Sequence, residues 1–119
     1  MDTRDAVAAL AALAQETRLA AFRLLVQAGD GGLAAGEIAQ ALDVPAPTLS
    51  FHLKELANAG LVASRQDGRN VIYRTAYAAM DELIAYLTDN CCHGGQCLPK
   101  TAAVATAAKR RAKTQERQP

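Results

Sequence analysis

The stretch from Ala35 to Arg74 restricts the possible folds of this chain more than any other part of the sequence. It begins with two short amphipathic helices, predicted over Ala35–Leu42 and Pro47–Ala59, which are joined by a tight turn at residues 43–46. Proline suits the first turn of a helix, and Gly60 provides the glycine that commonly follows a helix end. Two helices with this connection predict a helix-turn-helix unit.

Two β-prone runs follow this unit directly. They cover Leu61–Arg65 and Val71–Arg74, and residues 66–70, which include Gly68 and Arg69, join them as a hairpin. The predicted fold class is therefore α+β, mainly α: a winged helix-turn-helix with a two-stranded wing. In such a fold the helix Pro47–Ala59 enters the major groove of DNA, and Arg69 reaches the DNA backbone or the minor groove.

The helix Pro47–Ala59 has one apolar and one polar face. Leu49, Leu53 and Leu56 form the stripe that we expect to be buried. Phe51 lies on the polar face, where it could contact a thymine methyl group, pack on a neighbouring helix or simply be exposed. The hairpin that follows favours the contact with DNA. We expect DNA contacts from the following residues of the helix and the hairpin: Thr48, Ser50, Phe51, His52, Lys54, Arg65 and Arg69.

Three further helices are predicted around this motif, over residues 5–14, 16–28 and 77–89. Only 4% of the residues are aromatic, so a monomer of this size should have a small core. The last helix carries an apolar stripe that finds no obvious place in such a core: Met80, Leu83, Ile84 and Leu87. We expect a homodimer that pairs through the first and last helices, with burial in the monomer core as the alternative.

Charge alone does not identify a partner for this chain. The net charge is +1, but residues 1–98 carry −4 and residues 99–119 carry +5. We expect one domain over residues 1–98 and a basic, flexible tail over residues 99–119. The apolar run Ala6–Ala14 lacks the positive start of a signal peptide, and no run reaches the ~18 apolar residues of a membrane span. A cytoplasmic location, where thiols stay reduced, is expected.

All three cysteines, Cys91, Cys92 and Cys97, fall within seven residues. Thiolates select soft ions, and trivalent arsenic or antimony favours three ligands in a pyramid. Zinc prefers four ligands, and the adjacent His93 could supply the fourth. The same cysteines could instead bind another thiophilic metal, sense oxidants, or form a disulfide between Cys97 and a neighbour. A Cys-x-x-Cys with a supporting base, which would be more typical of a thiol enzyme, is absent.

Four segments together resemble the ArsR/SmtB family of metal-responsive repressors: residues 16–19, 47–56, 60–62 and 68–73. The resemblance extends over about residues 5–90. It implies a homodimeric winged-helix repressor that binds operator DNA without metal and leaves it when metal binds. The DNA-reading positions of the family correspond to Thr48, Ser50, Phe51 and His52, and its wing to Arg69.

Two departures from the family pattern concern the sensor site. The helix Ala35–Leu42 lacks the Cys-x-Cys of many arsenic sensors, and residues 77–89 lack the histidines of zinc sensors. The run Asn90-Cys91-Cys92 resembles an arsenite-responsive subgroup. We therefore expect As(III) or Sb(III) as the inducer, held by Cys91, Cys92 and Cys97, with no organic cofactor and no enzymatic activity. The alternative from another functional class is a thiol reductase or metal carrier.

Overall fold

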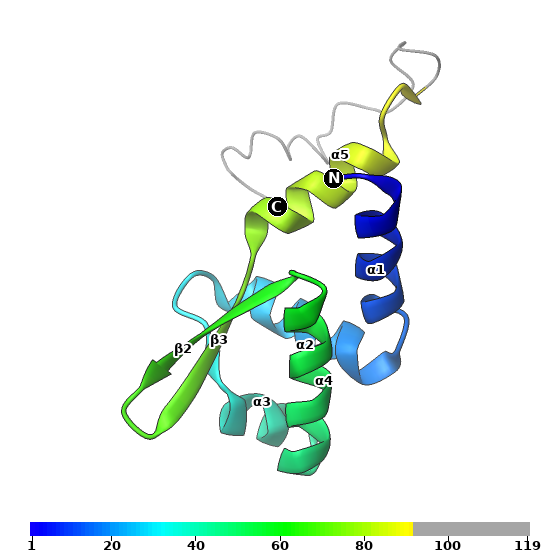
Figure 1. Ribbon diagram of the computed structural model, residues 1–119. Helices are drawn as coiled ribbons and strands as arrows, with labels where there is room; N and C mark the ends of the chain where they lie inside the picture. Colours follow the sequence, from blue (N-terminus) through cyan, green and yellow to red (C-terminus); the bar gives the residue numbers. More distant parts are fainter. Residues whose placement is uncertain (92–119) are drawn as a thin grey trace. The chain divides into compact units, whose positions relative to one another are not determined.

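The computed structural model describes residues 1–91, of which Met1–Leu87 form one compact unit and Thr88 begins a second. The expected ligands Cys92 and Cys97, and the expected domain boundary after residue 98, lie outside the described residues. Figure 1 shows a mainly helical fold with a small antiparallel sheet. In chain order the elements are α1 (Thr3–Leu13), α2 (Glu16–Ala28), β1 (Leu33–Ala34), α3 (Ala35–Leu42), α4 (Ala46–Asn58), β2 (Val62–Asp67), β3 (Asn70–Thr75) and α5 (Tyr77–Leu87).

Side chains next to the helix starts satisfy backbone donors that have no partner within the helix. The Asp2 carboxylate accepts the Asp5 N–H at 2.8 Å, and the Gln15 side chain accepts the Arg18 N–H at 2.9 Å. These caps fix where α1 and α2 begin. At the other end of the helix-turn-helix, Gly60 has a φ of 79° after the last turn of α4, as its predicted role requires.

The core joins all five helices of the described part of the chain to the base of the hairpin. The predicted stripe of α4 is fully buried, since Leu49, Leu53 and Leu56 are at most 1% exposed. They pack with Leu25 of α2 and Ile38 of α3 in the same cluster. Because one face of α4 is fixed in this core, its opposite face is held toward solvent.

The sheet has three strands in the order β1-β3-β2, and not the two that the sequence predicts. The strands β2 and β3 form the expected hairpin, while β1 adds two residues that pair with Ile72 and Tyr73 of β3. Gly32 precedes β1 with a φ of 72°, and a Cβ there would lie 2.3 Å from the Tyr73 carbonyl oxygen. Only glycine allows the chain to approach β3 this closely.

The helices α1 and α5 both leave large apolar side chains exposed, and α1 buries only small ones. Ala6, Ala9 and Ala12 of α1 are buried, whereas Val7 and Leu10 are 58% and 42% exposed. The predicted stripe of α5 is divided between the core and the surface. Leu83 is buried and Met80 packs on the core, but Ile84 and Leu87 are 54% and 57% exposed. Each helix therefore presents apolar surface that the described unit does not cover.

Within residues 1–91, no helix is long and apolar enough to cross a membrane. The longest helices of this part, α2 and α4, have 13 residues each.

Candidate nucleic-acid interface

The outward face of α4 brings together most of the residues that the sequence predicts to contact DNA. Thr48, Ser50, Phe51 and Lys54 are exposed, and His52 is half-buried at the edge of the same face. The helix follows α3 after a turn in which Asp43 adopts a left-handed conformation with a φ of 56°. This turn and the buried leucines hold α4 at the surface.

Phe51 and His52 form an aromatic pair on this face. The Phe51 side chain is 58% exposed, and its ring meets the His52 ring edge-on, with 5.5 Å between centroids and 64° between planes. Such a contact contributes about 0.5–1.5 kcal/mol when well packed, and less in water. The pair gives α4 an exposed apolar surface beside a hydrogen-bonding group, a combination suited to a thymine methyl and a neighbouring base edge.

The side chain of Arg18 contacts His52, and the sequence did not predict this contact. Its guanidinium Nη1 is 3.3 Å from Nδ1 of His52, and its Nε–H donates to the Ala12 carbonyl oxygen at 2.6 Å. Arg18 and His52 are 34 positions apart, so no local pattern pairs them. The sequence indicated a role for Arg18 only in that it lies in residues 16–19, one of the segments that resemble the ArsR/SmtB family.

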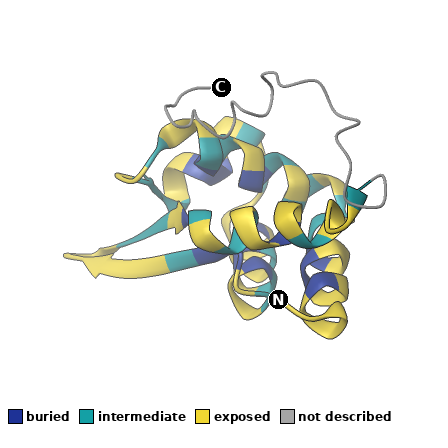
Figure 2. Cartoon of the chain, turned by 90° about the horizontal axis from the view of Figure 1, so that it is seen from above, coloured by how far each residue is buried: buried dark blue, intermediate teal, exposed yellow. Residues whose placement is uncertain are grey.

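The hairpin extends away from the helices, and its outer half is exposed (Figure 2). Its tip is formed by Gly68, with a φ of 64°, and by the exposed Arg69. Arg65 is also exposed, and its Nη2 donates to the Gly31 carbonyl oxygen at 3.3 Å. The two predicted hairpin arginines therefore differ, since Arg65 is tied to the loop before β1 and Arg69 stands at the tip.

A further arginine, Arg74, shares a face of the hairpin with Arg65 and was not predicted from the sequence. It pairs with Ala63 across the hairpin, and Arg65 pairs with Ile72. Side chains alternate between the faces of a strand, so Arg65 and Arg74 lie on the same face of the hairpin. Both are exposed. Arg74 lies two residues from Ile72, the partner of Arg65, and this spacing is the signal that could have placed Arg74 on the same face.

Of the three predicted metal ligands, only Cys91 falls in the described residues. Its thiol side chain is half-buried, and its N–H donates to the Thr88 carbonyl oxygen at 3.0 Å. Asn90, directly before it, has a φ of 58°, so the chain turns sharply after α5 has ended. Within residues 1–91 no three His, Cys, Asp or Glu side chains gather closely enough to hold a metal ion.

Comparison with known proteins places these features in a wider group. A family model described as a helix-turn-helix domain matches residues 13–65, from the end of α1 into β2. The transcriptional repressor SmtB of Mycobacterium tuberculosis is 36% identical over 88 residues, which cover 73% of this chain and 60% of SmtB. The transcriptional regulator YgaV of Escherichia coli is 30% identical over 88 residues, or 74% of this chain and 87% of YgaV.

Among solved structures, the homodimeric winged helix-turn-helix DNA-binding domain Mb0332 of Mycobacterium bovis, a possible ArsR-family regulator, is similar with a TM-score of 0.59. The two sequences are 28% identical, and the match covers 80% of this chain and 88% of that domain. The present chain spans 60–65% of the length of several of its curated relatives.

Proposed function

This chain belongs to the ArsR/SmtB family of winged-helix transcriptional regulators, and from that premise we propose that it is a homodimeric repressor of transcription. In this proposal it binds operator DNA and leaves the DNA when As(III) or Sb(III) binds Cys91, Cys92 and Cys97. The observation that carries the proposal is the exposed face of α4, with Phe51 and His52 outward while three leucines hold the helix from behind.

DNA recognition divides between α4 and the hairpin. Thr48, Ser50, Phe51 and His52 meet base edges in the major groove, because an α-helix fits that groove and each base pair has a distinct pattern there. Lys54 and Arg69 meet phosphates, which position the protein without reading sequence. Arg65 and Arg74 add positive charge to one face of the hairpin.

Two copies of the chain pair through α1 and α5. Val7, Leu10, Ile84 and Leu87 are each more than 40% exposed, although they are large and apolar. Burying each of these side chains fully is worth about 1.5–3 kcal/mol, which favours pairing over exposure. Mb0332 is a homodimer. The pair then presents two copies of α4 to half-sites about 34 Å apart, one turn of DNA.

The cysteines supply the sensor. Three thiolates suit a pyramidal As(III) or Sb(III) centre, and the first of them follows only four positions after the last residue of α5. Because α5 is part of the proposed dimer interface, an ion bound at its end can change how the two α4 helices are spaced. The coupling required is modest, since ~1–3 kcal/mol changes affinity about 5- to 150-fold.

Two measurements test the two halves of this proposal separately. Footprinting on the DNA upstream of the protein's own gene should give protected half-sites one helical turn apart, and a Phe51→Ala/His52→Ala variant should lose the protection. Native mass spectrometry should give one As(III) per protomer in the wild type, and none in a Cys91→Ser/Cys92→Ser variant. Absence of any protected site contradicts the DNA-binding half, and unchanged arsenic uptake by the cysteine variant contradicts the sensor.

A further inference from the structure

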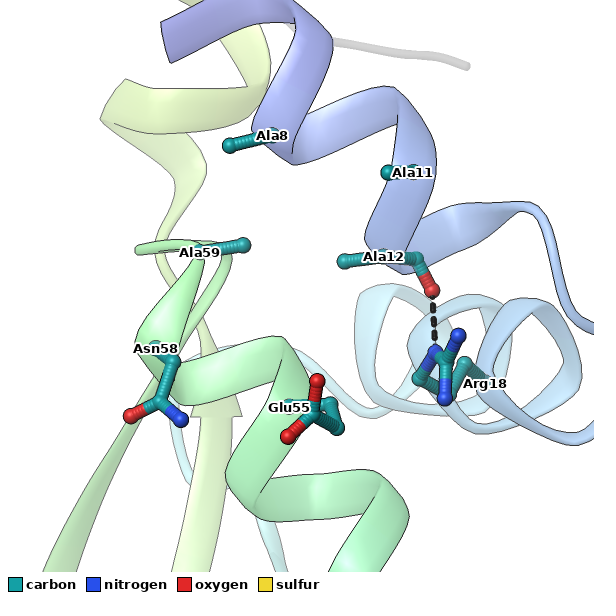
Figure 3. Close-up of a pocket in the computed structure, with 7 residues that line it drawn as sticks. All are labelled: Ala8, Ala11, Ala12, Arg18, Glu55, Asn58 and Ala59. Carbon is teal, nitrogen blue, oxygen red and sulfur yellow. Dashed lines mark hydrogen bonds between the residues drawn. The ribbon is translucent and has the colours of Figure 1, made fainter.

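One side chain, Arg18, connects α1, the start of α2 and the proposed reading helix α4. It is half-buried at the third residue of α2. Its Nε–H donates to the carbonyl oxygen of Ala12 in the last turn of α1 at 2.6 Å, as Figure 3 shows. Its Nη1 lies 3.3 Å from Nδ1 of His52 on α4.

The chemistry of this contact restricts where the proton of a neutral His52 ring can lie. A guanidinium has five N–H donors and no acceptor, and it stays protonated in proteins. The nitrogen that faces it, Nδ1, must therefore accept a hydrogen bond. A neutral imidazole has one acceptor and one donor nitrogen, so a neutral ring that accepts from Arg18 carries its proton on Nε2.

We propose that Arg18 is a positioning residue for DNA recognition: it holds His52 in the Nε2–H tautomer, so that His52 meets DNA as a hydrogen-bond donor only. This inference rests on the proposed DNA binding by α4. A donor at Nε2 selects acceptors, which on DNA are the N7 and O6 atoms of guanine, N7 of adenine, O4 of thymine and phosphate oxygens. The amino groups of cytosine and adenine are donors themselves, and His52 in this tautomer rejects them.

The Arg18 side chain is held by a hydrogen bond and is not enclosed by large side chains. With Glu55, Asn58 and three alanines of α1, Arg18 lines an open groove of about 290 Å³ between α1 and α4 (Figure 3). The anchor on Ala12 holds the guanidinium from the α1 side. Because the groove is open, a shorter or uncharged side chain at this position meets space or water, and not a steric clash.

The first test reads the tautomer in the free protein, without DNA. The chain has 2 histidines, so in a His93→Gln background long-range ¹H–¹⁵N NMR spectra contain the ring signals of His52 alone. At a pH where the ring is neutral, the proton is expected on Nε2. Arg18→Met keeps an unbranched, flexible side chain but removes every donor, and a mixture of both tautomers is expected.

An Nδ1–H ring in the wild type, or an identical tautomer in Arg18→Met, overturns the proposal. If Arg18→Met does not fold, the wild-type spectrum alone still decides between the two tautomers. The conservative Arg18→Lys retains a charged donor and is expected to keep more of the Nε2–H form than Arg18→Met.

The second test measures DNA affinity in a double-mutant cycle. In the wild-type background, Arg18→Met should weaken DNA binding roughly 3- to 10-fold, the equivalent of one hydrogen bond. Glutamine carries an amide donor that does not depend on Arg18. Arg18→Met should therefore have little effect in the His52→Gln background. Equal losses in both backgrounds indicate a general structural effect and overturn the proposal.

Single base-pair changes in the operator then separate the two sources of the acceptor. If the loss in Arg18→Met disappears when one base pair is changed, the acceptor is on that base; a loss that is uniform across all sequences identifies a phosphate oxygen. Either result supports the donor role of His52. If the protein binds no DNA, the proposed function is contradicted. The NMR test needs no DNA, so it still determines the tautomer of His52.

Discussion

The hydroxyl of Tyr77, the first residue of α5, donates to the carbonyl oxygen of Val26 in α2 at 2.9 Å. This bond ties the start of α5 to the helix that carries Arg18, across 51 positions of sequence. Partial burial of the phenol, and in second place the nearby Asp30 carboxylate, raise the pKa of Tyr77 above its ordinary value of 10.0. Both effects disfavour the tyrosinate in the folded protein.

Tyr77→Phe should therefore change how stability depends on alkaline pH. At neutral pH the variant loses one hydrogen bond, which lowers the free energy of unfolding by about 0.5–1.5 kcal/mol. As pH rises above 10.0, unfolded wild-type chains lose the phenol proton before folded ones do, so the wild type loses stability that the variant keeps. Urea unfolding at about pH 8 and about pH 11 should show the two proteins converging; a constant difference contradicts a raised pKa.

Gly32→Ala should destabilise the fold, because the new Cβ would lie 2.3 Å from the Tyr73 carbonyl oxygen at a φ of 72°. The expected loss in free energy of unfolding is about 2–4 kcal/mol, from backbone strain and overpacking together. Gly36→Ala is the matched control, since a Cβ there meets nothing within 4 Å and the residue is in a helix. The control should be neutral or stabilising by up to about 1 kcal/mol, and equal losses in both variants would refute the close approach.

Phe51→Ala and Leu53→Ala should separate recognition from stability, although the two residues are neighbours on α4. Leu53 is 0% exposed, so its truncation should cost about 2–5 kcal/mol of unfolding free energy. Phe51 is 58% exposed, and its truncation should change stability by less than about 1 kcal/mol while weakening DNA binding. Chemical unfolding and fluorescence anisotropy on DNA, both at fixed protein concentration, measure the two effects. If Phe51→Ala binds DNA as tightly as the wild type, the Phe51 ring does not contribute to DNA recognition.

Arg69→Ala should reduce the salt dependence of DNA binding. Each phosphate contact that is lost lowers the slope of log affinity against log salt by about 0.9, and the proposed dimer would lose two contacts. Arg23→Ala removes the same charge from an exposed position on α2 and serves as the control. Affinities measured over a series of salt concentrations should show a smaller slope for Arg69→Ala only. The same slope in both variants would place the hairpin tip away from the phosphates.

Local chemistry explains which parts of the fold could be predicted from the sequence. The bounds of α2 and α3 agree with the prediction, and α4 is shifted by one residue, because glycine and proline mark these ends strongly. The strand β1 was not predicted, because two residues are too few to show the alternation of apolar and polar residues that indicates a strand. The hairpin turn is shorter than expected, since β2 and β3 extend to Asp67 and Asn70 and leave only Gly68 and Arg69 between them.

Tertiary packing explains what could not be predicted. The alanines that pack α1 against its neighbours, Ala6, Ala9 and Ala12, have no strong hydrophobic signal in the sequence, while the larger Val7 and Leu10 lie exposed. The stripe of α5 was assigned to one surface, whereas Leu83 enters the core and Ile84 does not. The contact between Arg18 and His52 joins two helices that are distant in sequence, and no periodic pattern contains it.

The most direct test of the sensor mechanism is an arsenite titration of the preformed complex with fluorescent DNA from upstream of the protein's own gene. Anisotropy should fall as As(III) binds, with at least a roughly 5-fold loss of affinity in the wild type. The Cys91→Ser/Cys92→Ser variant should stay bound at the same arsenite concentrations, and Cys97→Ser reports whether that thiol is the third ligand. A wild-type complex that persists in saturating arsenite, or a double variant that dissociates equally, would contradict the mechanism.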